Sequence, residues 1–229
     1  MAPLRRDGCK ASLASIQLNS TTSVIHAVAT VGAAYRQVNG SSGLAAASNA
    51  DVIKWIPLAP YWVKLNFYGS MMNSSAAAGF VIRNSSGDPL VAGPRGLHPS
   101  SVPVAECHVL RDGLLAAKRF NHKNLVVESN SLLVLKCVQG SSLVPWRIKS
   151  IVHGIATLAK WFDNISFSHI FREMNFLADA LADLGHSLTN PKIWCNTIPT
   201  QVSITLHLDV IQVGCPWASC CNFLFSLKK

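Results

Sequence analysis

The spacing of apolar residues, which changes along residues 61–186, is the feature that most limits the fold. In the run VKLNFY, Val63, Leu65 and Phe67 alternate with Lys64, Asn66 and Tyr68, which predicts a half-buried strand that ends at the following Gly-Ser pair. Two further apolar runs flank the segment NSSGD at 84–88, a pattern typical of a β-hairpin. The first part of the region therefore predicts three consecutive antiparallel strands.

Helical spacing follows these strands. Residues 101–120 place a set of apolar side chains on one helical face, with a proline suited to the first turn: Ala105, Val109, Leu110, Leu114 and Ala117. A short strand at 124–129, helices over 131–140 and from Pro145, a strand at 165–173 and a last helix over 174–186 complete the order. This order predicts an α/β fold with a mixed five-stranded sheet flanked by helices.

The composition of the chain changes near Asp51. Residues 1–50 are rich in Ser and Ala and carry four basic residues and one acid. We expect residues 1–54 to form a disordered leader, residues 55–186 a single domain, and residues 187–229 a poorly defined tail without a second core. The leader's composition also fits an organellar transit peptide, although an intracellular nuclear or cytoplasmic protein is the favoured interpretation. No apolar run is long enough to span a bilayer.

The charge of the chain points to an anionic partner. Lys and Arg number 20 against 11 Asp and Glu, which gives a formal net charge of +9. Nucleic acid is the first candidate and a membrane surface the second, while a solvated basic surface is the alternative without a partner. The seven cysteines are odd in number and form no pair of CxxC motifs, which argues against a disulfide framework or a zinc site.

An ordered set of short motifs carries a family resemblance. The motifs are VKLN-x-x-GS, GFVIR-x-x-x-G, AE, VESNS and F-x-H-x-x-RE-x-N-x-x-AD-x-LA, within residues 55–186. This region resembles the ribonuclease H-like domain of plant proteins related to retrotransposon reverse transcriptases. The resemblance implies a ribonuclease H-like fold and RNA–DNA hybrid as the ligand. It also implies four acids that bind two Mg²⁺ or Mn²⁺ ions, which activate water and stabilise the leaving oxygen.

Two of the four acids that the resemblance implies are present in this chain. Glu106 matches the acid of the AE motif and Asp179 that of N-x-x-AD, whereas Tyr68 and Asn130 stand where the family has acids. A tyrosine hydroxyl is neutral at pH 7 and an asparagine carries no charge. Glu128, two residues before Asn130, is the remaining acid that could replace a metal ligand, although it would be displaced by about 7 Å along the strand.

Basic residues near helix ends are candidates for phosphate contacts. The candidates are Lys118, Arg119, Lys123, Lys136, Arg147 and Lys149. Trp146, next to Arg147, fits either a base-stacking site or a core anchor at the start of a helix, and we expect the core anchor.

These observations favour one function and leave two alternatives. The favoured function is a nucleic-acid-binding domain, with RNA–DNA hybrid as its ligand, whose catalysis is lost or crippled by Tyr68 and Asn130. The alternatives are an active metal-dependent endoribonuclease that cuts RNA in hybrids, and a decayed gene product with no selected activity.

Overall fold

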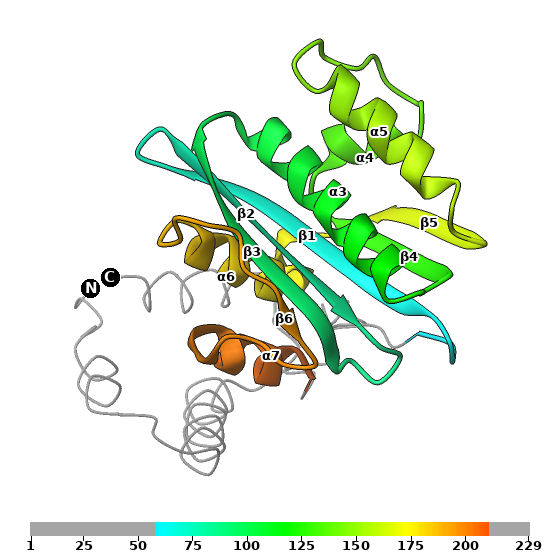
Figure 1. Ribbon diagram of the computed structural model, residues 1–229, viewed down its shortest axis with the longest axis vertical. Coiled ribbons are helices and arrows are strands. Elements are labelled where there is room, and N and C mark those ends of the chain that lie inside the picture. Colours follow the sequence, from blue (N-terminus) through cyan, green and yellow to red (C-terminus); the bar gives the residue numbers. More distant parts are fainter. Residues whose placement is uncertain (1–57, 211–229) are drawn as a thin grey trace, which may run out of the picture. The chain divides into compact units, whose positions relative to one another are not determined.

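A computed structural model describes residues 58–210, apart from the side chains of Glu173 and of residues 207–210. The expected leader, residues 1–54, and the tail beyond residue 210 lie outside the described residues. The strands are β1 (Val63–Met72), β2 (Ser75–Arg83), β3 (Pro89–Pro99), β4 (Asn124–Ser129), β5 (Asn164–His169) and β6 (Trp194–Cys195). The α-helices are α3 (Val102–Arg119), α4 (Leu132–Val138), α5 (Lys149–Ala159), α6 (Phe176–Gly185) and α7 (Ser203–Val210). Two 3-10 turns, η1 (Arg172–Met174) and η2 (Thr200–Val202), precede α6 and α7 (Figure 1).

The strands form one mixed sheet in the order β5-β4-β1-β2-β3-β6. Strands β1, β2 and β3 pair antiparallel, whereas β4 pairs parallel with both β1 and β5. The predicted α/β fold with three antiparallel strands first is confirmed. The predicted strand count was five, and the sheet has six because β6 pairs with Val91 and Ala92 of β3. A two-residue strand is too short to produce a periodic apolar pattern.

Strand β1 is longer than its sequence pattern indicates. It does not end at Gly69-Ser70, because these residues pair with Ala78 and Ala77 of β2. The chain reverses instead at Asn73 and Ser74, which both have positive φ values of 48° and 64°. Such values at two successive residues are those of a tight hairpin turn. Strand β1 therefore extends several residues on either side of Tyr68, and Tyr68 lies in the middle of the sheet.

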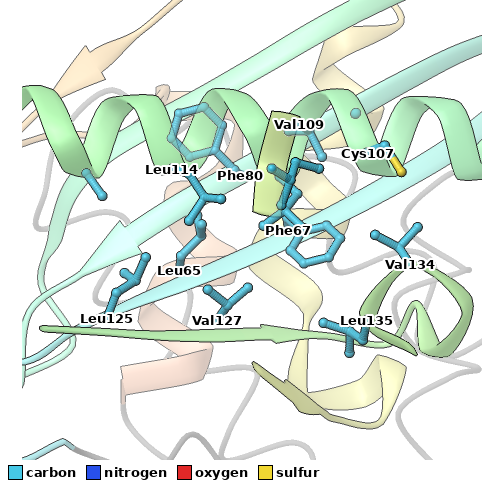
Figure 2. Packing of buried hydrophobic residues seen from close by; sticks show 14 of the residues in the cluster. Leu65, Phe67, Phe80, Cys107, Val109, Leu114, Leu125, Val127, Val134 and Leu135 are labelled. Carbon is cyan, nitrogen blue, oxygen red and sulfur yellow. The ribbon is translucent and has the colours of Figure 1, made fainter. Parts of the chain in front are cut away.

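The main hydrophobic core lies between one face of the sheet and helices α3, α4 and α5. Successive side chains of a strand point to opposite faces, and Leu65 and Phe67 of β1 point to this one. Figure 2 shows them packed with Leu114 of α3 and Val127 of β4. These four side chains are fully buried. Burial of a side chain of this size stabilises the fold by about 1.5–3 kcal/mol.

Helix α6 packs on the other face of the sheet, over Gly79 of β2. A Cβ added at Gly79 would lie 2.5 Å from the backbone nitrogen of Ala182 and from the Cβ of Leu181. The absence of a side chain at Gly79 therefore allows α6 to approach the sheet closely. Gly79 pairs directly with Tyr68 across β1 and β2, so the same close approach brings α6 against Tyr68.

The described part of the tail, residues 187–210, packs on the same side as α6. Val202 is buried in a small cluster with Val81 and Ala92 of the sheet and Leu177 and Leu181 of α6. This cluster is separate from the main core, and it lies on the face of the sheet that α6 covers. The boundaries expected from sequence at 55 and 186 remain a prediction.

Helix α5 begins at Lys149, four residues after the proline that was expected to open it. Pro145 and Trp146 lie in a turn, in which the Ile148 amide donates to the Pro145 carbonyl at 3.1 Å. Ile148 is 1% exposed and anchors the helix, whereas Trp146 is 80% exposed. The expectation that Trp146 is a core anchor is therefore wrong, because the neighbouring isoleucine fills that role. Among residues 58–210, no helix has the length and apolar character needed to cross a bilayer.

Candidate functional site

Tyr68 stands at the centre of the candidate site, on the face of β1 that α6 covers. It is 9% exposed and packs against Ala178 and Ala182 of α6. Burial, followed by the negative charge of Asp179, raises the pKa of Tyr68 to about 12. The phenol therefore stays protonated and neutral at physiological pH, and it cannot serve as an anionic oxygen ligand there.

Arg172 connects Tyr68 with Asp179. Its guanidinium carbon lies 5.4 Å from the centroid of the Tyr68 ring, within the range of a cation–π contact. A guanidinium nitrogen of Arg172 also donates to a carboxylate oxygen of Asp179 at 3.2 Å. Asp179 lies in the first turn of α6 and is largely buried. One carboxylate of the site is thus neutralised by a cation of the chain itself.

Glu106 approaches the site from α3, over the backbone of Gly69. A Cβ at Gly69 would lie 2.6 Å from the Glu106 Cγ, so the glycine makes room for this side chain. Burial raises the pKa of Glu106 to about 7, and a hydrogen bond from the Ser131 hydroxyl, at 2.6 Å, opposes the rise. Burial thus favours the protonated form of the Glu106 carboxyl.

Asn175, the residue before α6, links the middle of β1 to the residue that follows β4. Its side-chain nitrogen donates to the Phe67 carbonyl of β1 at 2.8 Å and to the Asn130 side-chain oxygen at 3.1 Å. Ser129, the last residue of β4, donates to the same Phe67 carbonyl at 2.9 Å. Asn130 is thus held beside the central strand through its oxygen, the atom that an aspartate would also present.

Glu128 makes its contacts elsewhere. Its carboxylate pairs with Lys64 at 2.9 Å and accepts a hydrogen bond from Asn66 at 3.3 Å. Asn66 in turn accepts from Arg83 at 3.0 Å. Lys64, Asn66 and Arg83 are each at most 2% exposed. Recruitment of Glu128 by a metal ion would take an anion away from the buried Lys64, at a large cost in free energy.

The donors present at the site do not fit a pair of divalent ions. Two such ions need several anionic oxygens, and the site offers Glu106, whose pKa is raised by burial, and Asp179, which is paired with Arg172. Tyr68 and Asn130 are neutral. Among the residues that the structure describes, no group of three or more His, Cys, Asp or Glu side chains could hold a metal ion.

The basic residues expected to contact phosphate fall into two groups. Lys118 and Arg119 end α3, twelve or more residues after Glu106, which places them about 18 Å along the helix from it. Lys123 lies just before β4, 3.5 Å from the Trp161 ring centroid, with Lys118 at 5.6 Å from the same centroid. In the other group, Lys136 lies in α4, Arg147 lies between α4 and α5, and Lys149 is the first residue of α5.

Three residues that shape the site were not assigned a role from sequence. Arg172 and Asn175 lie inside the motif RE-x-N-x-x-AD. Their partners, Tyr68 and Phe67, are more than 100 residues away along the chain. Ser131 follows Asn130 and binds Glu106 of α3. The motifs in the sequence mark the positions of Arg172 and Asn175. They do not show which distant residues these side chains contact.

Comparison with solved structures supports the fold. The ribonuclease H1 of the halophilic archaeon Halobacterium salinarum is 26% identical, with a TM-score of 0.52 over 55% of this chain and 98% of that one. LC11-RNase H1, solved in complex with an RNA/DNA hybrid, is 25% identical, with a TM-score of 0.51 over 55% and 96%. An N-terminal RNase H domain from Mycobacterium tuberculosis is 22% identical, with a TM-score of 0.53 over 55% and 94%.

Comparison with curated protein sequences gave no match. The sequence profile of one family, described as reverse transcriptase-like, matches residues 66–185. This match includes Tyr68, Glu106, Asn130 and Asp179, and it covers more than half of the 229 residues. The chain therefore belongs to the reverse transcriptase-like family, whose region here has the fold of ribonuclease H.

Proposed function

We propose that this chain binds RNA–DNA hybrid through its ribonuclease H-like domain and does not cut it. The proposal extends to its origin, as a degenerate domain of a plant protein related to retrotransposon reverse transcriptases, at work inside the cell. The arrangement of Arg172 carries the proposal. The guanidinium pairs with Asp179 and lies over the ring of Tyr68, so a protein cation neutralises an acid that the resemblance assigns to metal ions.

The charges of the other positions support the loss of catalysis. The Tyr68 phenol has a pKa of about 12 and the Glu106 carboxyl a pKa of about 7, and Asn130 is uncharged. Hydrolysis by two metal ions requires a site that holds both ions and lowers the pKa of a bound water. We infer that Mg²⁺ or Mn²⁺ binds here weakly, through Glu106 and Asp179 alone.

The proposed ligand rests on the comparisons and on charge. A similar structure, LC11-RNase H1, was solved with an RNA/DNA hybrid, and this chain has a formal net charge of +9. Phosphate neutralisation by Lys and Arg supplies much of the affinity of such proteins. Arg147 and Lys149 are both exposed and are candidates for these phosphate contacts.

An active endoribonuclease is the second candidate, favoured by the retained acids. Glu106 and Asp179 both affect the pKa of Tyr68, so the two carboxylates remain close to one position. A metal ion that displaced Arg172 from Asp179 could bind the carboxylates of both Glu106 and Asp179.

A hybrid-binding and cleavage experiment separates the two candidates. The full chain is titrated against a labelled RNA–DNA hybrid in EDTA and again in Mg²⁺, and the products are resolved on a denaturing gel. Binding of similar strength in both buffers, without cleavage, supports the proposal. Cleavage in Mg²⁺ that Glu106→Gln abolishes would establish the enzyme, and absence of binding in both buffers would refute both functions.

A further inference from the structure

The turn between α4 and α5 exposes large apolar side chains next to cations. Trp146 is 80% exposed and Leu143 is 95% exposed. Arg147, Lys149 and Lys136 are exposed beside them in the chain. An exposed tryptophan in a folded domain is a candidate contact for a partner, because burial of its ring on binding is favourable.

The turn is fixed to the domain on both sides of Trp146. Val144 packs against the main core and Ile148 is buried in it. The Cys137 thiol donates to the Leu143 carbonyl at 3.7 Å, and the Ile148 amide donates to the Pro145 carbonyl at 3.1 Å. Trp146 thus projects from an anchored turn, and little conformational entropy is lost when a partner binds to its ring.

The stretch of sequence that contains Trp146 carries charges of one sign. Between Glu128 and Asp163 the sequence contains no acid, and it contains Lys136, Arg147, Lys149 and Lys160. The guanidinium carbon of Arg147 lies 5.3 Å from the centroid of the Trp146 ring. The indole ring of Trp146 can stack on another flat ring, and the neighbouring cations can contact anions. A nucleic acid offers both, in its bases and its phosphates.

We propose that Trp146 is a stacking site for an unpaired base of single-stranded nucleic acid, with Arg147 and Lys149 on the adjoining phosphates. A base on one face of the indole and a guanidinium near the ring are the elements of sequence-independent single-strand binding. A base inside a duplex is stacked between its neighbours, so its faces are not available to Trp146. The site therefore selects single strands, or the unpaired end of a hybrid, and it does not depend on hybrid binding by the rest of the domain.

The test measures the affinity of the full chain for a labelled single-stranded oligothymidine by fluorescence anisotropy. Trp146→Ala is expected to weaken binding about tenfold or more, since stacking of one base accounts for that much, and Trp146→Phe is expected to recover most of it. Leu143→Ala is the matched control, because it removes a more exposed apolar side chain from the same turn and leaves the ring in place. Thermal unfolding confirms that each variant is folded, as expected for exposed positions.

A second ligand separates stacking from charge. An abasic oligonucleotide of equal length keeps the phosphates, and it is expected to bind more weakly than oligothymidine to the unaltered protein and equally to Trp146→Ala. Equal affinity of both ligands for the unaltered protein would overturn the proposal in favour of charge alone. Loss of affinity in Leu143→Ala as large as in Trp146→Ala would also overturn it, as would absence of single-strand binding. A separate titration with blunt hybrid reports on the proposed function independently of these outcomes.

Discussion

At the scale of single residues, the buried carboxyl of Glu106 makes the stability of the protein depend on pH. Its pKa of about 7 lies above the ordinary value of 4.5 because the carboxyl is buried. A raised pKa in the folded state means that Glu106 favours folding fully below pH 4.5. This contribution is lost as the pH rises through 7. At higher pH the buried carboxylate destabilises the protein.

Glu106→Gln should therefore raise the unfolding temperature at pH 8 by several degrees and change it little at pH 4.5. The gain is on the order of 3 kcal/mol at most, from the difference between the two pKa values, and the Gln oxygen can still accept from Ser131. Thermal unfolding monitored by circular dichroism at both pH values measures it. Glu128→Gln is the control, and should lower the midpoint because it removes an anionic partner of the buried Lys64. A Glu106→Gln midpoint at pH 8 equal to that of the unaltered protein would contradict the assigned pKa.

Tyr68 contributes through its ring, and a small acid in its place should leave a cavity. Tyr68→Asp removes the contacts with Ala178 and Ala182 and buries a carboxyl near Asp179, so we expect a loss of about 2–4 kcal/mol in EDTA. Tyr68→Phe keeps the ring and should change the free energy of unfolding by less than about 1 kcal/mol. Chemical denaturation of both variants checks this. An equal loss in both would show that the hydroxyl matters more than the ring.

At the scale of elements, the close contact between α6 and β2 positions the site. Gly79→Ala places a Cβ 2.5 Å from the backbone of α6 and should cost about 1–3 kcal/mol or more, since the helix must move. Gly154→Ala is the matched control, because no atom lies within 4 Å of the added Cβ and alanine is the better residue in the middle of α5, by about 1 kcal/mol. The two variants should therefore shift the urea midpoint in opposite directions. Equal shifts would contradict the packing of α6 described above.

The element order and most element bounds could be predicted from sequence, because long amphipathic segments repeat their apolar spacing several times. Strand β4 and helix α3 lie where the pattern predicted them. The predictions failed where a segment gives too few repeats, as in the two residues of β6. Strand β1 was cut short at its glycine, because pairing with β2 outweighs local propensity in the hairpin. Trp146 was predicted to be buried and is exposed, because residue type alone did not show which of Trp146 and Ile148 packs in the core.

The candidate site was predicted less completely than the fold. Positions 68, 106, 130 and 179 each belong to a short sequence motif, so they could be named from sequence. The contact of Arg172 with Tyr68 joins η1 to β1 across more than a hundred residues. The hydrogen bonds of Asn175 join the start of α6 to the middle of β1 and to Asn130, the residue after β4. Such contacts depend on how the elements pack, and no local pattern encodes them.

At the scale of the whole molecule, the net charge of +9 should make hybrid binding depend on salt. Affinity for a blunt RNA–DNA hybrid should fall about tenfold or more between ~50 and ~200 mM salt, which corresponds to two or more phosphate contacts. Double substitution of Arg147 and Lys149 by Gln should reduce the slope, whereas the same change at Lys118 and Arg119, far along α3, should reduce it less. An affinity that is unchanged over this range would contradict phosphate binding.

We propose that this domain retains the fold of ribonuclease H and has lost its metal chemistry. A Mg²⁺-dependent cleavage assay on RNA–DNA hybrid tests it most directly, comparing the unaltered protein with the double variant Tyr68→Asp/Asn130→Asp. The account predicts no cleavage above background by the unaltered protein. It predicts measurable cleavage by the double variant, because two restored carboxylates join Glu106 and Asp179, with Asn175 still able to donate to position 130. Single substitutions should restore little, since ligands that act as a unit are not additive, and Glu106→Gln in the double variant should abolish the activity. Cleavage by the unaltered protein that requires Mg²⁺ and Glu106 would contradict the account.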